Sequence, residues 1–556
     1  MPTTETSIAG QQDRAAGSGV VLLTLASGQF LMALDSSVMN VSIATVADDL
    51  GTTVTGIQTA ITLYTLVMAS LMITGGKVGQ ILGRKRAFAI GCMIYGAGSL
   101  ITSVAPNLAV LLIGWSVLEG IGAALIMPAI VALVASNFSR AGRPRAYGLV
   151  AAAGAVAVAV GPLIGGLLTT YASWRWVFAG EVVIVIGIVL LARRMADVPA
   201  DRTARLDLIG TVLSALGLGL IVFGTIRAGA WGFISPKPGA PEWLGLSPVI
   251  WLVVAGGLVL LGFFDWERRR QTNGAAVLID PALLSNKLLR GGLTAFFFQY
   301  LLQAGLFFVV PLFLSVALGL SAIATGLRIL PLSIALLAAA VGIPKLFPHV
   351  SPRRVVRLGF LSLFLGLLSL AAALEVGVGA AVVTWPLLLA GLGVGALASQ
   401  LGSVTVSAVR DDQSAEVGGV QNSVTFLGAS IGTALAGAVL ISALSSSFFT
   451  GIQNNPDVPA KLSSQAQVEL AGGIPFISDD KLSQALTDEG VTGTTATAII
   501  EENEAARLDG LRSALGVLAV IALIALYFAT GVPKRQPSDV GPPPGSDDTG
   551  PKPRLA

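Results

Sequence analysis

Residues 108–133 read LAVLLIGWSVLEGIGAALIMPAIVAL, an apolar run that contains a single charged side chain, Glu119. Because an α-helix rises about 1.5 Å per residue, about 20 such residues cross the roughly 30 Å hydrocarbon core of a bilayer. Similar runs recur from residue 20 to residue 532, and only 12% of all residues are charged. That is about half the share found in soluble domains. The composition therefore excludes a soluble protein of ordinary design.

The apolar runs predict fourteen membrane-spanning helices and hence an all-α polytopic membrane protein. Backbone N–H and C=O groups in lipid must be satisfied within their own segment, which favours helices over strands. The expected spans are 20–44, 56–78, 87–105, 108–133, 147–169, 175–193, 207–226, 248–264, 289–316, 322–343, 355–374, 382–407, 417–445 and 511–531.

The distribution of basic residues predicts the orientation. With the amino terminus in the cytoplasm, roughly three quarters of the 34 Lys and Arg residues fall in inner segments. We therefore expect a multi-pass protein of the inner (plasma) membrane with two cytoplasmic tails, residues 1–19 and a disordered stretch over 533–556. The net charge of +3 is too small to indicate nucleic-acid binding.

An internal repeat divides the chain into two halves. It predicts an N-terminal six-helix bundle (20–194), two inserted helices (207–264) and a C-terminal six-helix bundle (289–531) that contains an extracytoplasmic segment (446–510). Parallel repeats of this kind are typical of alternating-access carriers. At one constant offset, the matches are Leu50-Gly51 with Leu318-Gly319, Lys85-Arg86 with Arg353-Arg354, Gly91 with Gly359, and Gly98 with Gly366.

Several kinds of chemistry are excluded by the residues present. The chain has one cysteine, Cys92, and one histidine, His349, which rules out an intramolecular disulfide and most catalytic and metal-site schemes. Lys77 is not followed by Ser or Thr, so the phosphate-binding loop of an ATP-driven pump is missing. We expect no enzymatic activity, no metal and no cofactor, with a small-molecule substrate and the lipid bilayer as partners.

Two motifs stand at structurally sensitive places. GKVGQILGRKR (residues 76–86) joins the second and third spans, and its small and basic residues predict a conformational latch between half-bundles at Gly76, Gly83, Arg84, Lys85 and Arg86. The alternative is that the basic cluster only sets topology. GAVAVAVGPLIGG (residues 154–166) gives the fifth span a small-residue face and a proline, at Gly154, Gly161, Pro162, Gly165 and Gly166; close helix packing alone is the alternative role.

These two motifs resemble the signature loop and the antiporter helix of the major facilitator superfamily, in its fourteen-span drug:proton antiporter branch. The resemblance implies two six-helix bundles plus two inserted helices. It also implies multidrug-type export of amphipathic, often cationic, compounds by alternating access, with the proton motive force as energy source. Three further stretches are similar to that branch: LDSSVMNV (34–41), SWRWVF (173–178) and GVQN with LG (419–422 and 427–428).

Four positions depart from the family pattern. Gln80 stands where the signature loop usually has Asp, and Glu181 where the sixth helix commonly has Asn. In the fourth span, Ser116 and Glu119 replace the Arg and Gln of the family motif. Since that Arg is tied to proton coupling in the family, coupling does not carry over directly from the resemblance.

Three carboxylates lie within the predicted spans of the first half. Asp35, Glu119 and Glu181 are each costly in lipid, by about 2.5–3.5 kcal/mol on insertion scales, so each needs a reason to be there. Carboxylates that share a poorly solvated cavity can bind and release a proton near neutral pH. We hypothesise that Asp35 is the main proton or cation site, assisted by Glu119 and Glu181; for Glu181, an interfacial, hydrated position is an equal alternative.

The second half offers amides rather than acids. They either line a substrate path or hydrogen-bond between helices, and the second role is the more common. Together with one amide of the first span, the candidates for the cavity lining are Asn40, Gln299, Gln303, Gln400 and Asn422.

Other functions are left open by the sequence. One alternative is a carrier for a specific physiological solute or lipid-like metabolite with altered or no proton coupling, and another is a membrane sensor that does not transport. The polar segment 446–510 predicts a gate at the exit or a contact with an envelope partner, with helix starts at Ser478 and Thr494. We expect a monomer.

Overall fold

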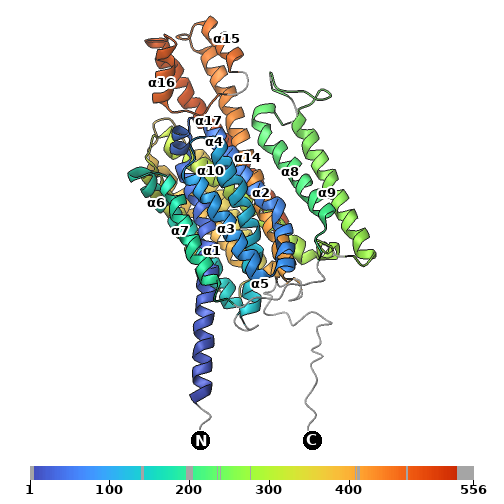
Figure 1. Ribbon diagram of the computed structural model, residues 1–556. Helices are drawn as coiled ribbons and strands as arrows, with labels where there is room; N and C mark the ends of the chain where they lie inside the picture. Colours follow the sequence, from blue (N-terminus) through green and yellow to red (C-terminus); the bar gives the residue numbers. More distant parts are fainter. Residues whose placement is uncertain are drawn as a thin grey trace, which may run out of the picture.

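The computed structural model describes residues 5–138, 143–195, 205–233, 236–237, 239–275, 277–347, 349–406, 408–409, 414–470 and 474–534. These residues form an all-helical bundle, in which the only strand-like pairing is an isolated bridge between Trp243 and Leu246. The N-terminal end of α1 lies at one end of the bundle, and α15 and α16 lie at the other (Figure 1). The prediction of a disordered tail concerns residues 533–556, most of which lie outside the described ranges.

The predicted all-helical fold is confirmed. Twelve helices of the described chain are long and apolar enough to cross a membrane, and α6 adds a thirteenth if its two arms, which meet at 41°, form one span. The remaining predicted span, 87–105, is α3, whose first turn is basic. The long helices are α1 (Glu5–Asp49), α2 (Val54–Leu82), α3 (Arg84–Ser103), α4 (Leu108–Leu111) continuing through the π-helical η1 (Leu112–Glu119) into α5 (Gly120–Asn137), α6 (Arg143–Tyr171), α7 (Arg175–Ala192), α8 (Leu208–Trp231), α9 (Pro248–Thr272), α10 (Lys287–Leu312) with the π-helical η3 (Phe313–Ala317), α11 (Ala322–Leu346), α12 (Pro352–Ala373), α13 (Thr384–Val406), α14 (Ser414–Asn454) and α17 (Thr494–Phe528).

The short helices lie in the connections. They are η2 (Pro281–Ser285), η4 (Ala380–Val383), α15 (Ala460–Glu469), α16 (Asp479–Asp488) and η6 (Ala529–Gly531). Side-chain caps mark the starts of several helices: the Thr53 side chain accepts from Gly56 N, and the Ser321 side chain from Ala324 N. Such caps satisfy backbone donors that the first helical turn leaves without partners.

The internal repeat is visible in the way the helices pack. In the first half α1 packs on α6, α2 and α3 pack on α5, and α3 packs on α7; in the second half α10 packs on α14, α11 and α12 pack on α13, and α12 packs on α17. The repeated glycines share roles as well. A Cβ at Gly91 would meet Gly122 O at 2.9 Å, and one at Gly359 would meet Gly393 O at 3.0 Å. Gly51 and Gly319, with φ of 59° and 63°, both end a helix in the left-handed region that favours glycine.

The two inserted helices form a separate hairpin. α8 and α9 pack on each other, and α8 alone contacts the bundle extensively, against α2 and α14 (Figure 1). At the end of the hairpin where α8 starts and α9 ends, Asp207 accepts from Trp266 Nε1 at 2.8 Å and pairs with Arg270 at 3.1 Å. This network joins the start of α8 to the end of α9.

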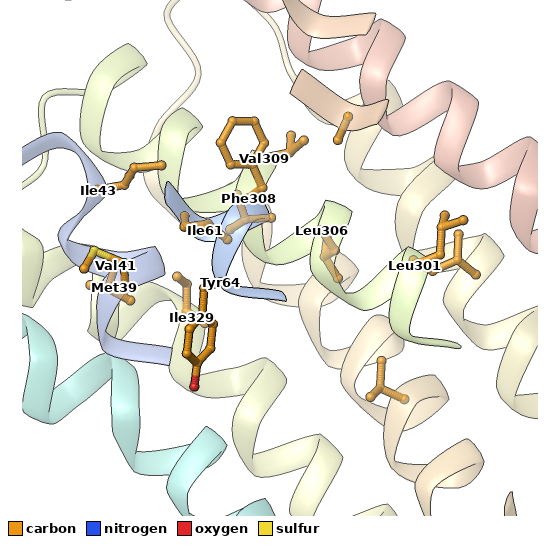
Figure 2. Packing of buried hydrophobic residues seen from close by; sticks show 14 of the residues in the cluster. Met39, Val41, Ile43, Ile61, Tyr64, Leu301, Leu306, Phe308, Val309 and Ile329 are labelled. Carbon is orange, nitrogen blue, oxygen red and sulfur yellow. The ribbon is translucent and has the colours of Figure 1, made fainter. Parts of the chain in front are cut away.

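The two halves meet along α2 with α14 and along α6 with α11. A continuous cluster of buried apolar side chains crosses between them, including Met39 and Ile61 of the first half with Phe308 and Ile329 of the second (Figure 2). Polar contacts add to it: Gln58 Nε2 donates to Thr433 O at 3.0 Å, and Ile323 N donates to Thr170 Oγ1 at 3.1 Å. In the predicted orientation, both contacts lie in the outer half of the membrane.

The extracytoplasmic segment differs from the expectation in one respect. The predicted bounds are 446–510, whereas α14 runs unbroken to Asn454 and α17 runs unbroken from Thr494 to Phe528. An unbroken helix keeps its backbone hydrogen bonds as it leaves the membrane, so polarity alone does not end it. The two predicted helix starts, after Ser478 and at Thr494, are confirmed.

Candidate proton and substrate site

The three acidic residues predicted in the spans of the first half lie together. Asp35 comes from α1, Glu119 from the last residue of η1 and Glu181 from α7. All three side chains are buried, and one carboxylate oxygen from each lies within 4.8 Å of the others. Glu181 is 1% exposed, so the interfacial, hydrated alternative does not describe this structure. We call Asp35, Glu119 and Glu181 the carboxylate triad.

The triad receives very different numbers of hydrogen bonds. The indole Nε1 of Trp115 donates to both oxygens of Asp35, at 2.8 and 2.9 Å. Ser99 Oγ donates to Glu181 Oε2 at 3.1 Å. Both oxygens of Glu119 and Oε1 of Glu181 have no hydrogen-bond partner among the described residues. Asp35 therefore accepts the most hydrogen bonds of the three carboxylates, and Glu119 accepts the fewest.

An aromatic wall encloses the triad. Tyr64 stacks on Trp115 with ring centroids 5.1 Å apart and planes at 8°. Tyr64 and Tyr95 lie beside Asp35, and their buried hydroxyls make no hydrogen bond of normal geometry within the described chain. Trp115 and Glu119 both belong to the π-helical turn η1, a rare geometry that often marks functional sites.

Electrostatic repulsion limits how many of the three can be ionised together. At 4.8 Å, two unit charges repel by about 3.5 kcal/mol if the effective dielectric constant is about 20. No ion pair within the described residues reaches the triad. The balancing positive charge must therefore come from protons or from a bound cation. Carboxylate oxygens at this spacing suit shared protons and also hard cations such as Ca²⁺.

The amides are dispersed rather than gathered. Asn40 lines a small cavity between the halves together with Ser37, Pro162, Phe307 and Ile329, and its Nδ2 donates to Ser36 O at 2.6 Å. The other four amides do not line that cavity. Gln299 is buried with an unpartnered Oε1, Gln400 Nε2 donates to Ser399 Oγ at 3.3 Å, and Gln303 and Asn422 are half-buried.

The small-residue face of α6 packs on both halves of the molecule. A Cβ at Gly154, Gly161 or Gly165 would meet Gln29, Ser37 or Val38 of α1, respectively, at 3.2, 2.4 and 2.9 Å. A Cβ at Gly166 would meet Ala322 O of α11 at 2.5 Å, and one at Gly326 of α11 would meet Pro162 O at 2.1 Å. Close packing is therefore the observed role of the motif, and it includes the contact between the halves.

The basic motif makes its described contacts within the first half. Gly83, with φ 94°, joins α2 to α3; Arg84 Nη1 donates to Gly76 O at 3.0 Å. Lys85 Nζ donates to Arg193 O at 2.9 Å and to Met195 O at 2.8 Å, beyond the C-terminal end of α7. A cation is favourable there because the last helical carbonyls carry partial negative charge. Arg86 is exposed. A latch between the half-bundles stays a prediction.

A comparison of variants at Lys85 and Arg86 distinguishes the role of these contacts from a role in membrane topology alone. Lys85→Met and Arg86→Met remove the same charge from the same cytoplasmic cluster, but only the first removes the two bonds to the carbonyls after α7. We expect Lys85→Met to lower stability by about 1 kcal/mol and to slow transport severalfold, with Arg86→Met close to wild type. Thermal unfolding in detergent and efflux from vesicles measure the two effects. Equal behaviour of the two variants would leave topology as the only role of the cluster.

Sequence reasoning missed the partners of the acids. Trp115, Tyr64, Tyr95 and Ser99 were not singled out, although Trp115 precedes Glu119 by one helical turn in the same apolar run. A tryptophan in mid-span has an N–H group that needs an acceptor, and this was the available signal.

A duplicated six-helix unit, with buried carboxylates in one half and a cavity between the halves, defines a polytopic membrane transporter of the alternating-access type. The comparisons agree: the family model of the Major Facilitator Superfamily matches residues 25–433. This chain belongs to the major facilitator superfamily.

Among curated relatives, the puromycin resistance protein pur8 of Streptomyces alboniger is 31% identical over 425 residues, which cover 75% of this chain and 81% of the relative. The multidrug efflux pump LfrA of Mycolicibacterium smegmatis is 27% identical and covers 92% of this chain and 96% of its own. A solved structure of the peptide transporter POT in complex with sulfate matches with a TM-score of 0.55 at 15% identity, over 92% of this chain and 96% of that one. At that identity the likeness shows the fold alone.

Proposed function

We propose that this protein is a proton-coupled exporter of amphipathic, often cationic, small molecules in the inner (plasma) membrane. The carboxylate triad carries the proposal: three buried acids with no basic partner in the described chain need exchangeable positive charge, and protons and cationic substrates both supply it. The resistance and efflux roles in the names of the relatives agree with an exporter. The cytoplasmic placement of both termini is part of the proposal and rests on the distribution of basic residues.

The proposal is tested by flux measurements on the purified full-length protein in proteoliposomes. A panel of lipophilic cations, with ethidium as the reference compound, and neutral compounds of similar size is followed under an imposed pH gradient and without it. We expect gradient-dependent transport of the cations that stops when an ionophore collapses the gradient. Transport at the same rate with and without the pH gradient would favour a carrier without proton coupling. Binding of the compounds without flux would favour a sensor.

We also propose that the extracytoplasmic segment (446–510) closes the exit. The support is a pair of ionic contacts at the outer end of α1: Asp49 pairs with Arg175 of the first half, whereas Asp48 pairs with Lys481 of α16. The segment is itself held together by Arg507, which is buried and donates to Ile477 O at 2.8 Å and to Asp479 Oδ1 at 2.5 Å. The Asp48–Lys481 pair must break when the outer ends of the halves separate.

Lys481→Met is expected to increase the fraction of molecules that are open to the outside. An exposed ion pair contributes at most about 1 kcal/mol, so the increase is up to about fivefold. Lys461→Met, which removes an exposed lysine of the same segment, is the matched control. Both are compared by the rate at which an externally added thiol reagent reacts with a cysteine introduced at Asn40, after replacement of Cys92 by Ser. Equal rates would contradict the gate and leave an envelope partner as the role of the segment.

A further inference from the structure

We infer that the carboxylate triad holds two protons in the conformation described here, on Glu119 and Glu181, while Asp35 keeps the single negative charge. The inference rests on the proposed function and adds to it a coupling number: two protons enter for each molecule of substrate that leaves. The inference follows from the number of hydrogen-bond donors that lie near each of the three carboxylates.

Asp35 is built to stay ionised. The indole N–H of Trp115 is aimed at both of its oxygens, and stacking on Tyr64 holds the indole in place. The hydroxyl of Tyr64 lies beside the same carboxylate, and that of Tyr95 lies beside both Asp35 and Glu119. Hydrogen bonds donated to a carboxylate favour its charged form, and a proton on Asp35 would oppose the indole N–H.

Glu119 is the opposite case. It is 0% exposed, and neither oxygen accepts a hydrogen bond of normal geometry from the described residues, although the hydroxyls of Ser99 and Tyr95 lie beside it. An ionised carboxylate there would have lost its water without any replacement, which is the most unfavourable arrangement for a buried charge. A proton removes the charge and turns Glu119 into a donor that faces two other carboxylates.

Glu181 has one donor, and that donor is shared. Ser99 Oγ lies 3.1 Å from Glu181 Oε2 and 3.2 Å from Tyr95 O, but a hydroxyl has a single hydrogen and can serve only one acceptor at a time. Oε1 of Glu181 has no partner in the described chain. Glu181 therefore takes the second proton more readily than Asp35 does.

The count of two follows from the distances. With one proton, two negative charges would remain within 4.8 Å of each other and no ion pair would offset them. With three protons, the single indole N–H, which is shared between the two oxygens of Asp35, would face a neutral acid. On inward opening, the O–H bonds of Glu119 and Glu181 break and both protons leave to the cytoplasm. In the open state water surrounds the triad and weakens the repulsion between its three negative charges, so the triad accepts the cationic substrate; two protons from outside displace it on the other face.

The experiment uses the electrical consequence of this count. Exchange of two protons for one monovalent cation moves net charge, whereas exchange of one proton does not. In proteoliposomes with equal pH on both sides, a potassium diffusion potential alone is therefore expected to drive ethidium transport by the wild type. Glu119→Gln and Glu181→Gln are each expected to lose this response while still responding to a pH gradient, because each keeps one titrating acid. Flux through protein-free liposomes is subtracted.

Glu267→Gln is the matched control. Glu267 is also a buried acid of a spanning helix, but it lies in α9 and accepts from Leu278 N at 2.9 Å, away from the triad. This variant is expected to keep both responses. A wild type that responds to the pH gradient but not to potential would overturn the inference and leave the proposed function intact; failure of the pH gradient itself would overturn the proposed function.

A second measurement covers variants that fold but do not transport. Infrared difference spectra of the full-length protein in lipid nanodiscs, recorded between neutral and alkaline pH, report protonated carboxyl groups directly. We expect Glu119→Gln and Glu181→Gln each to lose the signal of one protonated carboxyl group relative to the wild type, and Asp265→Asn, which changes an exposed acid, to lose none. A signal that falls only in Asp35→Asn would assign the proton to Asp35 and contradict the inference.

Discussion

Asp35→Asn is expected to reduce export of cations at least about a hundredfold, because an anion about 4 Å from a cation contributes about 4 kcal/mol at an effective dielectric constant of about 20. Asparagine has nearly the shape of aspartate and keeps one oxygen as an acceptor for the Trp115 indole, so the fold should persist. The substitution removes the negative charge that lies beside Glu119 and Glu181. Glu119 and Glu181 still bind and release protons, but the cationic substrate loses the carboxylate that stays ionised throughout the cycle.

The measurement is ethidium efflux in proteoliposomes under an imposed pH gradient, with thermal unfolding as the check on folding. Asp265→Asn is the control, because Asp265 is an exposed acid of α9 that pairs with Arg269 one turn away. Such exposed pairs contribute little to stability. Should Asp35→Asn and the double variant Glu119→Gln, Glu181→Gln both retain pH-driven transport, the triad is not the coupling site.

Gly326→Ala is expected to disturb the conformational cycle without touching the triad. The added methyl would lie 2.1 Å from Pro162 O, a backbone atom that cannot swing aside, so α6 and α11 must separate. Overpacking of this kind costs about 1–3 kcal/mol, equivalent to about a five- to 150-fold shift between conformations. Because the contact joins the two halves, the shift favours states with separated outer ends, and export should fall severalfold.

Gly342→Ala is the matched control for this variant. Gly342 lies in the same helix, and a Cβ there would have no atom within 4 Å. Both substitutions also raise helix propensity by a similar amount, so that effect cancels. Alkylation from outside of a cysteine introduced at Asn40, in the Cys92→Ser background, reports the opening. The interpretation fails if Gly326→Ala and Gly342→Ala label at the same rate and export equally well.

The sequence predicted the elements of this fold closely. Apolar runs such as 108–133 had to be helices, since lipid offers no other partner for the backbone. Gly51 and Gly319, matched by the repeat, both end helices with positive φ. The extent of α14 and α17 was not predictable in the same way, because polar residues beyond the membrane are compatible with an unbroken helix as well as with a loop.

The candidate site was predicted in its members but not in its arrangement. The cost of burying Asp35, Glu119 and Glu181 singled them out, and this physical argument needs only local hydropathy. The local sequence does not show that three helices, which are far apart along the chain, direct their acidic side chains to a common point. The rotation of each helix depends on packing such as Gly98 against Glu119, where a Cβ would lie 2.7 Å from Cγ.

By itself, then, the sequence determined that this protein is helical, lies in a membrane, repeats a six-helix unit and has three acids where lipid tolerates few. Only the tertiary structure decided that the acids meet, that Trp115 donates to Asp35 while Glu119 accepts no hydrogen bond of normal geometry from the described residues, and that α6 and α11 join the two halves through Gly166 and Gly326. The physical reason is that hydropathy and helix length are sums along the chain. Hydrogen bonds and backbone approach depend on distances and directions between segments, and packing alone sets those.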